Sequence, residues 1–141
     1  MFSIHVETVD NVAVIQCEGS MVRSEAAFLL RDAIMSQQHA RVVVVELSEV
    51  HTTGGGALGM FVYVQRWALD HDIKLKIFNP SNALRDKLER ASMSAFDIAS
   101  ADEIIALLDR AQESRKGQRR SRHTQPLRPP QPLGGSEYHL R

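Results

Sequence analysis

Residues 42–60, which read VVVVELSEVHTTGGGALGM, decide the fold. Residues 42–47 form an almost unbroken apolar run, and a strand has this composition only when both of its faces are covered. We therefore expect this strand in the interior of a sheet. Residues 48–56 are polar and rich in glycine, which predicts a loop, and the strongly apolar residues 57–69 predict a helix.

Toward the N-terminus, the pattern predicts a hairpin followed by a helix. Residues 2–9 alternate between apolar and polar side chains, as in a half-buried strand. Asp10 and Asn11 provide turn chemistry, and residues 12–17 form a second strand that ends near Gly19. Residues 24–37 change to helical spacing.

Toward the C-terminus, residues 73–78 predict another strand, residues 79–81 break it and begin a short helix, and residues 96–98 add a brief edge strand. Ser100 and Glu103 form a capping box for a last helix. Alternating strands and helices indicate a single α/β domain over residues 1–112. We expect a mainly parallel central sheet of four to five strands with about four helices.

The remaining residues, 113–141, differ from this domain in charge and composition. Residues 1–112 contain 10 Lys and Arg against 15 Asp and Glu, a balance of −5, whereas residues 113–141 contain 7 against 2, a balance of +5. The second segment is polar, basic and rich in proline and glycine, so we expect a disordered tail. Such a tail could contact an acidic partner, nucleic acid or an anionic membrane face, but more often it is only a solubilising linker, and we expect no nucleic acid as a partner.

The composition also limits the cellular setting. The single cysteine, Cys17, excludes an internal disulfide and alternates with apolar residues, which indicates a buried structural thiol. No signal peptide is recognisable, and no stretch approaches the roughly 20 apolar residues of a membrane span. We expect a cytoplasmic protein.

Two chemical interpretations of residues 51–59 fail on context. Gly54, Gly56 and Gly59 fit the G-x-G-x-x-G dinucleotide pattern, but the next strand ends without the acidic residue that this pattern needs. His51 lies beside threonines, yet no G-x-S-x-G, paired carboxylates or His/Cys cluster accompanies it. We therefore expect no enzyme activity, no cofactor and no metal.

A third interpretation is a family resemblance. Residues 47–50 read LSEV and residues 57–59 read ALG, which resembles the strand–loop–helix motif L-S-G-V-x-x-x-D-S-S-G-L-G of STAS domains. Residues 74–81, KLKIFNPS, match a second region at the family's spacing, and Gly19 lies where the family has G-E-L-D. The resemblance covers residues 2–109 and implies a regulatory protein-binding module similar to anti-sigma factor antagonists.

The sequence departs from the family at the phosphorylation site. The family's aspartate aligns with Gly54, its two hydroxyl residues with Gly55 and Gly56, and the second acidic position with Val22. The resemblance then implies that no phosphoacceptor remains. Thr52 or Thr53 stays open as a shifted acceptor, although we expect each to lie several residues before the helix.

The partner-binding region predicted from the resemblance comprises the loop and the start of the following helix. Its residues are Thr52, Thr53, Gly54, Gly55, Gly56, Ala57, Leu58, Met60 and Tyr63. Met60, Tyr63, Val64 and Trp67 exceed the apolar stripe that a surface helix needs, so they could face a partner, or the helix could be buried by its own neighbours.

The resemblance implies a kinase-like anti-sigma factor as the partner. Two alternatives stay open, namely a subunit of a larger lipid-transport or stressosome-like assembly, and a nucleotide or small-ligand binder that uses the glycines.

Overall fold

The computed structural model describes residues 1–91, 96–121 and 136–139, with side chains described up to residue 113. The elements follow the order β-β-α-β-α-β-α-β-α-β. They are β1 (Phe2–Val9), β2 (Val12–Met21), α1 (Ser24–Met35), β3 (Val42–Thr53), α2 (Gly55–Asp70), β4 (Lys74–Phe78), α3 (Asn82–Arg90), β5 (Asp97–Ala99), α4 (Ala101–Ser121) and β6 (Ser136–His139).

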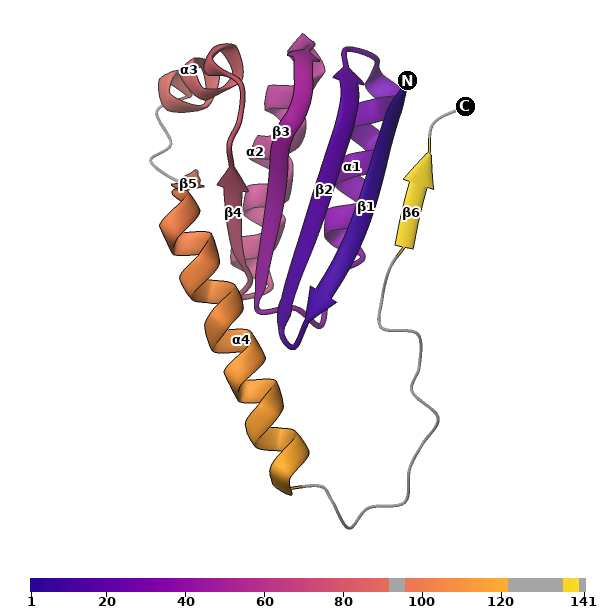
Figure 1. Ribbon diagram of the computed structural model, residues 1–141. Coiled ribbons are helices and arrows are strands. Elements are labelled where there is room, and N and C mark those ends of the chain that lie inside the picture. Colours follow the sequence, from indigo (N-terminus) through magenta and orange to yellow (C-terminus); the bar gives the residue numbers. More distant parts are fainter. Residues whose placement is uncertain (92–95, 122–135, 140–141) are drawn as a thin grey trace.

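The strands form one mixed sheet in the order β5-β4-β3-β2-β1-β6 (Figure 1). β1 pairs antiparallel with β2 through a turn at Asp10, whose φ of 53° is left-handed. From β2 to β5 all neighbouring strands are parallel. The predicted single α/β domain with a mixed, mainly parallel central sheet and four helices is confirmed.

Helices cover both faces of the sheet, and alternate residues of β3 point to different helices. Val43 and Val45 belong to the larger core, which also contains the buried side chains of α1, α2 and α3. Val44 belongs to a smaller core with Ile104 and Ala111 of α4. The apolar run at residues 42–45 therefore reflects a central strand with two covered faces, as predicted.

Local capping places the shorter helices. The Oγ of Ser81 accepts a hydrogen bond from the backbone N–H of Leu84 at 3.2 Å, which begins α3. The Oγ of Ser100 accepts from the N–H of Glu103, also at 3.2 Å, so the predicted N-cap of α4 is confirmed.

Two parts of residues 113–141 belong to secondary-structure elements. α4 continues past residue 112 to Ser121, and Ser136–His139 pairs antiparallel with β1. Residues 113–121 contain Glu, Lys, Arg and Gln, which are good helix formers, so the helix need not end where the apolar stripe ends. Residues 122–135 and 140–141 lie outside the described part, and their expected disorder stays a prediction. No helix in the described ranges is long and apolar enough to cross a membrane.

Gly19 is required near the upper end of β2. Its φ of +112° is rarely adopted by residues with a side chain, and a Cβ atom would collide with the carbonyl oxygen of Met1. The same carbonyl accepts a hydrogen bond from the N–H of Ser20 at 3.3 Å. Only glycine at this position lets the end of β2 lie this close to the start of β1.

The packing of α2 on the sheet predicts a sharp difference between two aromatic residues. Phe61 is fully buried, so Phe61→Ala should lower the free energy of unfolding by about 3–5 kcal/mol through lost burial and an unfilled cavity. Tyr63, two residues away, is 56% exposed, and Tyr63→Ala should change it by no more than about 0.5 kcal/mol. Urea unfolding of both variants measures the difference; equal effects would contradict this packing.

Candidate functional site

The candidate site lies where β2 and β3 end and α2 begins. The parallel pairing of these strands continues beyond Leu47, through Gly19 opposite Val50 to Met21 opposite Thr53. Residues 48–53 therefore extend β3, and the prediction of a loop over residues 48–56 is wrong for them. Irregularities in the register interrupt the alternation, which leaves both Ser48 and Glu49 exposed and hid the strand from sequence patterning.

The two threonines before the glycines sit at the end of this strand pair. The Oγ1 of Thr52 donates a hydrogen bond to the Oγ of Ser20 at 2.7 Å. Thr53 is half-buried opposite Met21, whose carbonyl accepts the N–H of Gly54 at 2.9 Å. Since α2 begins at Gly55, Thr53 is much closer to the helix start than the sequence suggested.

Gly54 is in direct contact with Val22. It is the N-cap residue of α2, in an extended conformation with φ of −94°. A Cβ atom at Gly54 would lie 2.6 Å from the carbonyl oxygen of Val22 and 3.2 Å from its Cα, so a side chain does not fit unless Val22 moves. The two positions that the resemblance aligns with the family's acidic residues are therefore neighbours, occupied here by an exposed valine and a glycine.

The following glycines belong to the helix. A Cβ atom at Gly55, Gly56 or Gly59 would meet nothing within 4 Å, and none of these residues has a positive φ. α2 has no side-chain cap at Gly54 and no acidic residue in its first turn. The prediction of a glycine loop is corrected: these residues expose the bare backbone of the first turns of a helix.

The apolar residues of α2 divide between core and surface. Met60 and Val64 are buried, and so is Ala57. Trp67 and Leu58 are partly buried and pack against the larger core. The interpretation that Met60 and Val64 face a partner is therefore wrong, because α2 lies against the sheet and between α1 and α3.

Tyr63 faces outward on the side of α2 that lies beside α1. It shares a shallow hollow with Arg31, whose guanidinium lies 4.9 Å from the centre of the Phe28 ring. Phe28 is 52% exposed, and neither it nor Arg31 was among the predicted site residues. A phenylalanine that lies off the apolar stripe of an amphipathic helix is the sequence signal that could have identified this position. We give the name α1–α2 surface to the exposed residues Val22, Phe28, Gly55, Gly56, Gly59, Val62 and Tyr63 together with the half-buried Arg31, which forms an ion pair with Asp32 at 3.1 Å.

The chemical groups near this site are few. His51 is exposed, and within the described residues no group of three His, Cys, Asp or Glu side chains could hold a metal ion. Cys17 is buried in β2, and desolvation raises the pKa of its thiol far above the usual range, with the charge of Glu46 as a smaller cause. The thiol is therefore an unreactive core residue, as predicted.

The STAS domain family model matches residues 3–104. The chain belongs to the STAS domain family. This match spans β1 to the beginning of α4 and includes Val22 and the glycines at 54–56.

Solved structures with this STAS fold include anti-sigma factor antagonists. The phosphorylated form of the Bacillus cell fate determinant SpoIIAA is 16% identical with a TM-score of 0.61, over 74% of this chain and 98% of that one. An anti-sigma factor antagonist from Mycobacterium paratuberculosis is 18% identical with a TM-score of 0.63, over 77% and 95%. At these identities the likeness establishes the fold. No curated protein sequence matches the chain significantly.

Two glycines of this STAS domain should respond oppositely to alanine. Gly54→Ala should lower the free energy of unfolding by about 1–3 kcal/mol, because its Cβ would press on the Val22 carbonyl. Gly59→Ala, in an exposed and open helical position, should raise it by about 0.5–1 kcal/mol. Thermal or urea unfolding distinguishes them, and a tolerated Gly54→Ala would contradict the close Val22 contact.

Proposed function

We propose that this STAS domain is a regulatory protein-binding module whose α1–α2 surface binds its partner without a phosphorylation switch at residues 54–57. The single observation that supports this most strongly is the contact between Val22 and Gly54, which puts an apolar side chain and a bare backbone where the family has acidic residues. The fold shared with anti-sigma factor antagonists supports the same class of function.

The absence of a switch follows from the chemistry of the site. Phosphorylation of a serine adds about −1.5 to −2 charges, enough to repel or attract a docked partner. Residues 54–57 are Gly-Gly-Gly-Ala and have no hydroxyl group to accept phosphate. The nearest hydroxyl groups in the preceding sequence belong to Thr53, which is half-buried, and Thr52, whose Oγ1 donates a hydrogen bond to the Oγ of Ser20. The surface therefore keeps one charge state, and binding is constitutive.

The α1–α2 surface has features of a protein interface. Phe28 and Tyr63 expose about half of their area beside Arg31, and Tyr and Arg are enriched where interfaces are fully desolvated. Gly55, Gly56 and Gly59 have no side chains, so a partner can approach the helix backbone closely. By analogy with the antagonists, we propose a kinase-like anti-sigma factor as that partner.

Affinity capture with the full chain tests the proposal. The wild-type chain should retain a kinase-like anti-sigma factor, and Gly56→Glu should lower the affinity at least about tenfold by adding a charge to an apolar contact. Tyr63→Ala should weaken the same complex. Lys87→Glu, an exposed position on α3, is the control and should leave it unchanged.

Other results would identify the alternatives. If a transporter ATPase or a scaffold protein is retained, the chain is a subunit of a larger assembly. If it binds a nucleotide saturably and Gly56→Val abolishes that binding, the glycines form a ligand site. In either case the anti-sigma role proposed here would be wrong.

Phosphate mapping tests the missing switch directly. After incubation with the retained kinase-like partner and ATP, mass spectrometry should find no phosphate on residues 52–57. Gly56→Ser is the matched positive control, because a side chain at 56 meets open space and restores the hydroxyl group. Phosphate on Thr52 or Thr53 of the wild-type chain would show that the acceptor has shifted.

A further inference from the structure

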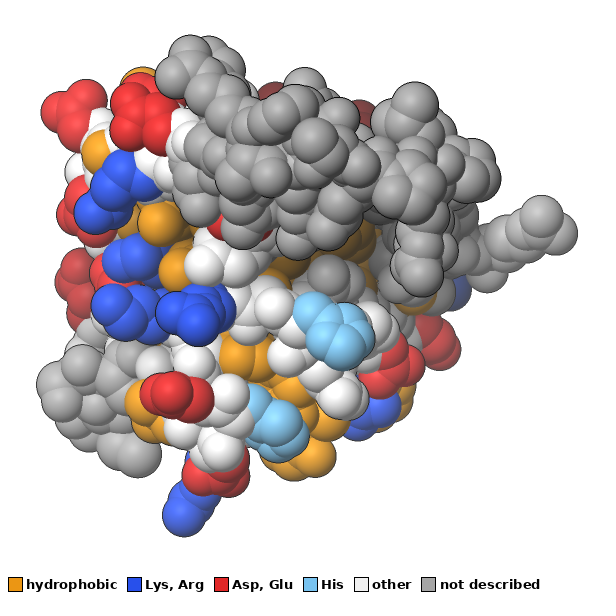
Figure 2. Space-filling view, turned by 90° about the horizontal axis from the view of Figure 1, so that it is seen from below, with side chains coloured by type: hydrophobic (Ala, Val, Ile, Leu, Met, Phe, Trp, Pro, Cys, Tyr) orange, Lys and Arg blue, Asp and Glu red, His pale blue; other side chains and the backbone are white. Residues whose placement is uncertain are grey.

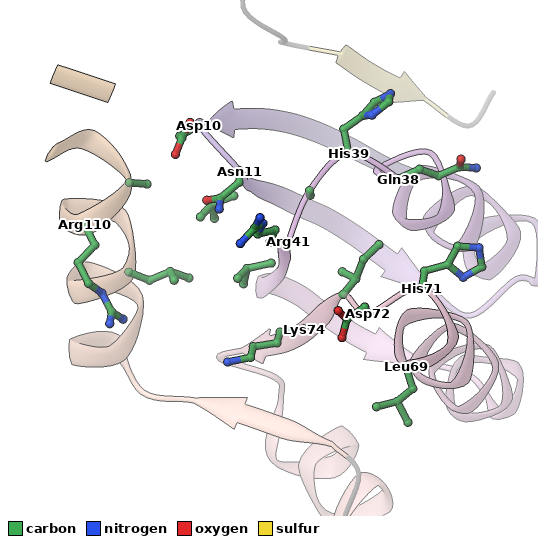
Figure 3. Close-up of a pocket in the computed structure, with 16 residues that line it drawn as sticks. Asp10, Asn11, Gln38, His39, Arg41, Leu69, His71, Asp72, Lys74 and Arg110 are labelled. Atoms are coloured by element: carbon green, nitrogen blue, oxygen red, sulfur yellow. The ribbon is translucent and has the colours of Figure 1, made fainter. Parts of the chain in front are cut away.

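A groove of about 960 Å³ lies at the opposite end of the sheet from the start of α2. Its walls are the starts of β3 and β4, the end of α2 and one side of α4. Figure 3 shows Arg41 and Lys74 on the sheet side and Arg110 on α4, around the same opening. Viewed from this end, Figure 2 shows Lys and Arg side chains gathered together, with histidines nearby.

The parallel sheet places two of these cations side by side. Arg41 directly precedes β3 and Lys74 is the first residue of β4. The backbone N–H of Lys74 donates to the carbonyl of Arg41 at 2.9 Å, and the N–H of Arg41 donates to the carbonyl of Asn11 at 2.8 Å. These bonds fix the backbone of both residues at the rim of the groove while their side chains stay exposed.

The three cations lack a carboxylate partner in the described side chains, although the Nε of Arg110 donates a hydrogen bond to the carbonyl of Ala106 at 3.4 Å. Within residues 1–91 and 96–113, none of Arg41, Lys74 and Arg110 forms an ion pair within 4.0 Å. Asp10 and Asp72 also line the groove, so Lys and Arg outnumber the acidic residues there. α4 then runs beyond the lower end of the sheet (Figure 1), and Arg115, Lys116, Arg119 and Arg120 lie on that extension.

Apolar residues form part of the remaining wall, together with the polar side chains of Asn11, Gln38, His39 and His71. Val42 and Leu107 are half-buried in it, and Leu69 at the rim is 65% exposed. A ligand that fills the groove must therefore satisfy cations and cover apolar surface at once. A flat membrane does not enter a groove, and among the described residues no Phe, Tyr or Trp lines it, so only His39 and His71 offer rings for nucleic-acid bases to stack on.

We propose that this groove binds an acidic segment of a protein partner in which carboxylates alternate with apolar side chains. Carboxylates pair with Arg41, Lys74 and Arg110, and the apolar side chains cover Leu69, Val42 and Leu107. The chain's own tail is an unsuitable occupant, because residues 113–141 have a balance of +5.

The test measures the binding of a short fluorescent peptide, in which Glu and Leu alternate, to the full chain by fluorescence anisotropy. The triple variant Arg41→Glu, Lys74→Glu and Arg110→Glu should bind at least about tenfold more weakly. Arg85→Glu, Lys87→Glu and Arg90→Glu make the same charge change on exposed positions of α3 and should bind like wild type. Far-ultraviolet circular dichroism confirms that both variants are folded.

A second variant separates charge from apolar contact. Leu69→Ser should weaken binding of the Glu/Leu peptide several-fold and leave binding of an oligoglutamate of equal charge unchanged, because only the first has side chains to cover Leu69.

Three results would overturn the proposal. They are no measurable binding of the peptide, equal weakening by the α3 control, and binding of a thymidine oligomer or phosphatidylglycerol vesicles as tight as that of the peptide. The last result would assign the cations to phosphate rather than to an acidic protein segment.

Discussion

The parallel pairing of β2 with β3 over their whole length is the constraint on which the upper end of the domain depends. It brings Met21 level with Thr53, so the chain leaves both strands at the same height. The N–H of Gly54 then bonds to the carbonyl of Met21, and α2 begins one residue later. Val22, the next residue after β2, is thereby pressed against Gly54. A shorter pairing would separate these residues and leave a true loop between strand and helix.

The two positions that the resemblance aligns with the family's acidic residues lie against each other in the fold. A side chain at Gly54 would lie against the backbone of Val22, so glycine at this position lets the end of β2 and the start of α2 approach closely. The glycines at 55 and 56 face open space, so their side chains are absent for another reason than packing. The close approach of a partner, as proposed above, would account for their absence.

The sequence predicted what depends on local periodicity and missed what depends on pairing between distant strands. Val43, Val44 and Val45 indicated a central strand because burial on both faces leaves no polar position. Ser48 and Glu49 concealed the rest of β3, because a register irregularity opposite β2 turns two consecutive side chains outward. The same limit applies to the surface residues, whose exposure depends on tertiary packing. Tyr63 is exposed, Met60 is buried, and the sequence pattern did not single out the exposed Phe28, since only the packing of α1 beside α2 decides which side chains stay exposed.

A formal charge of zero conceals an uneven distribution of charge over the molecule. The uncovered part of the sheet presents Glu18, Glu46 and Glu49 around one hollow, whereas Arg41, Lys74 and Arg110 outnumber Asp10 and Asp72 around the groove at the lower end. α4 contributes to this arrangement, because it packs across the sheet from β5 to β2 and extends its basic end beyond the strands. Regions of opposite charge that are held apart in a rigid domain orient a charged partner before it makes contact. Salt screens these charges, so the attraction is largely lost beyond about 10 Å at an ionic strength of about 0.1 M. The proposed α1–α2 surface is mostly apolar, and its Arg31 is paired with Asp32 at 3.1 Å, so we expect binding there to depend less on salt than binding in the groove. The two proposed contacts therefore differ in kind, one set by shape and apolar area and the other by charge.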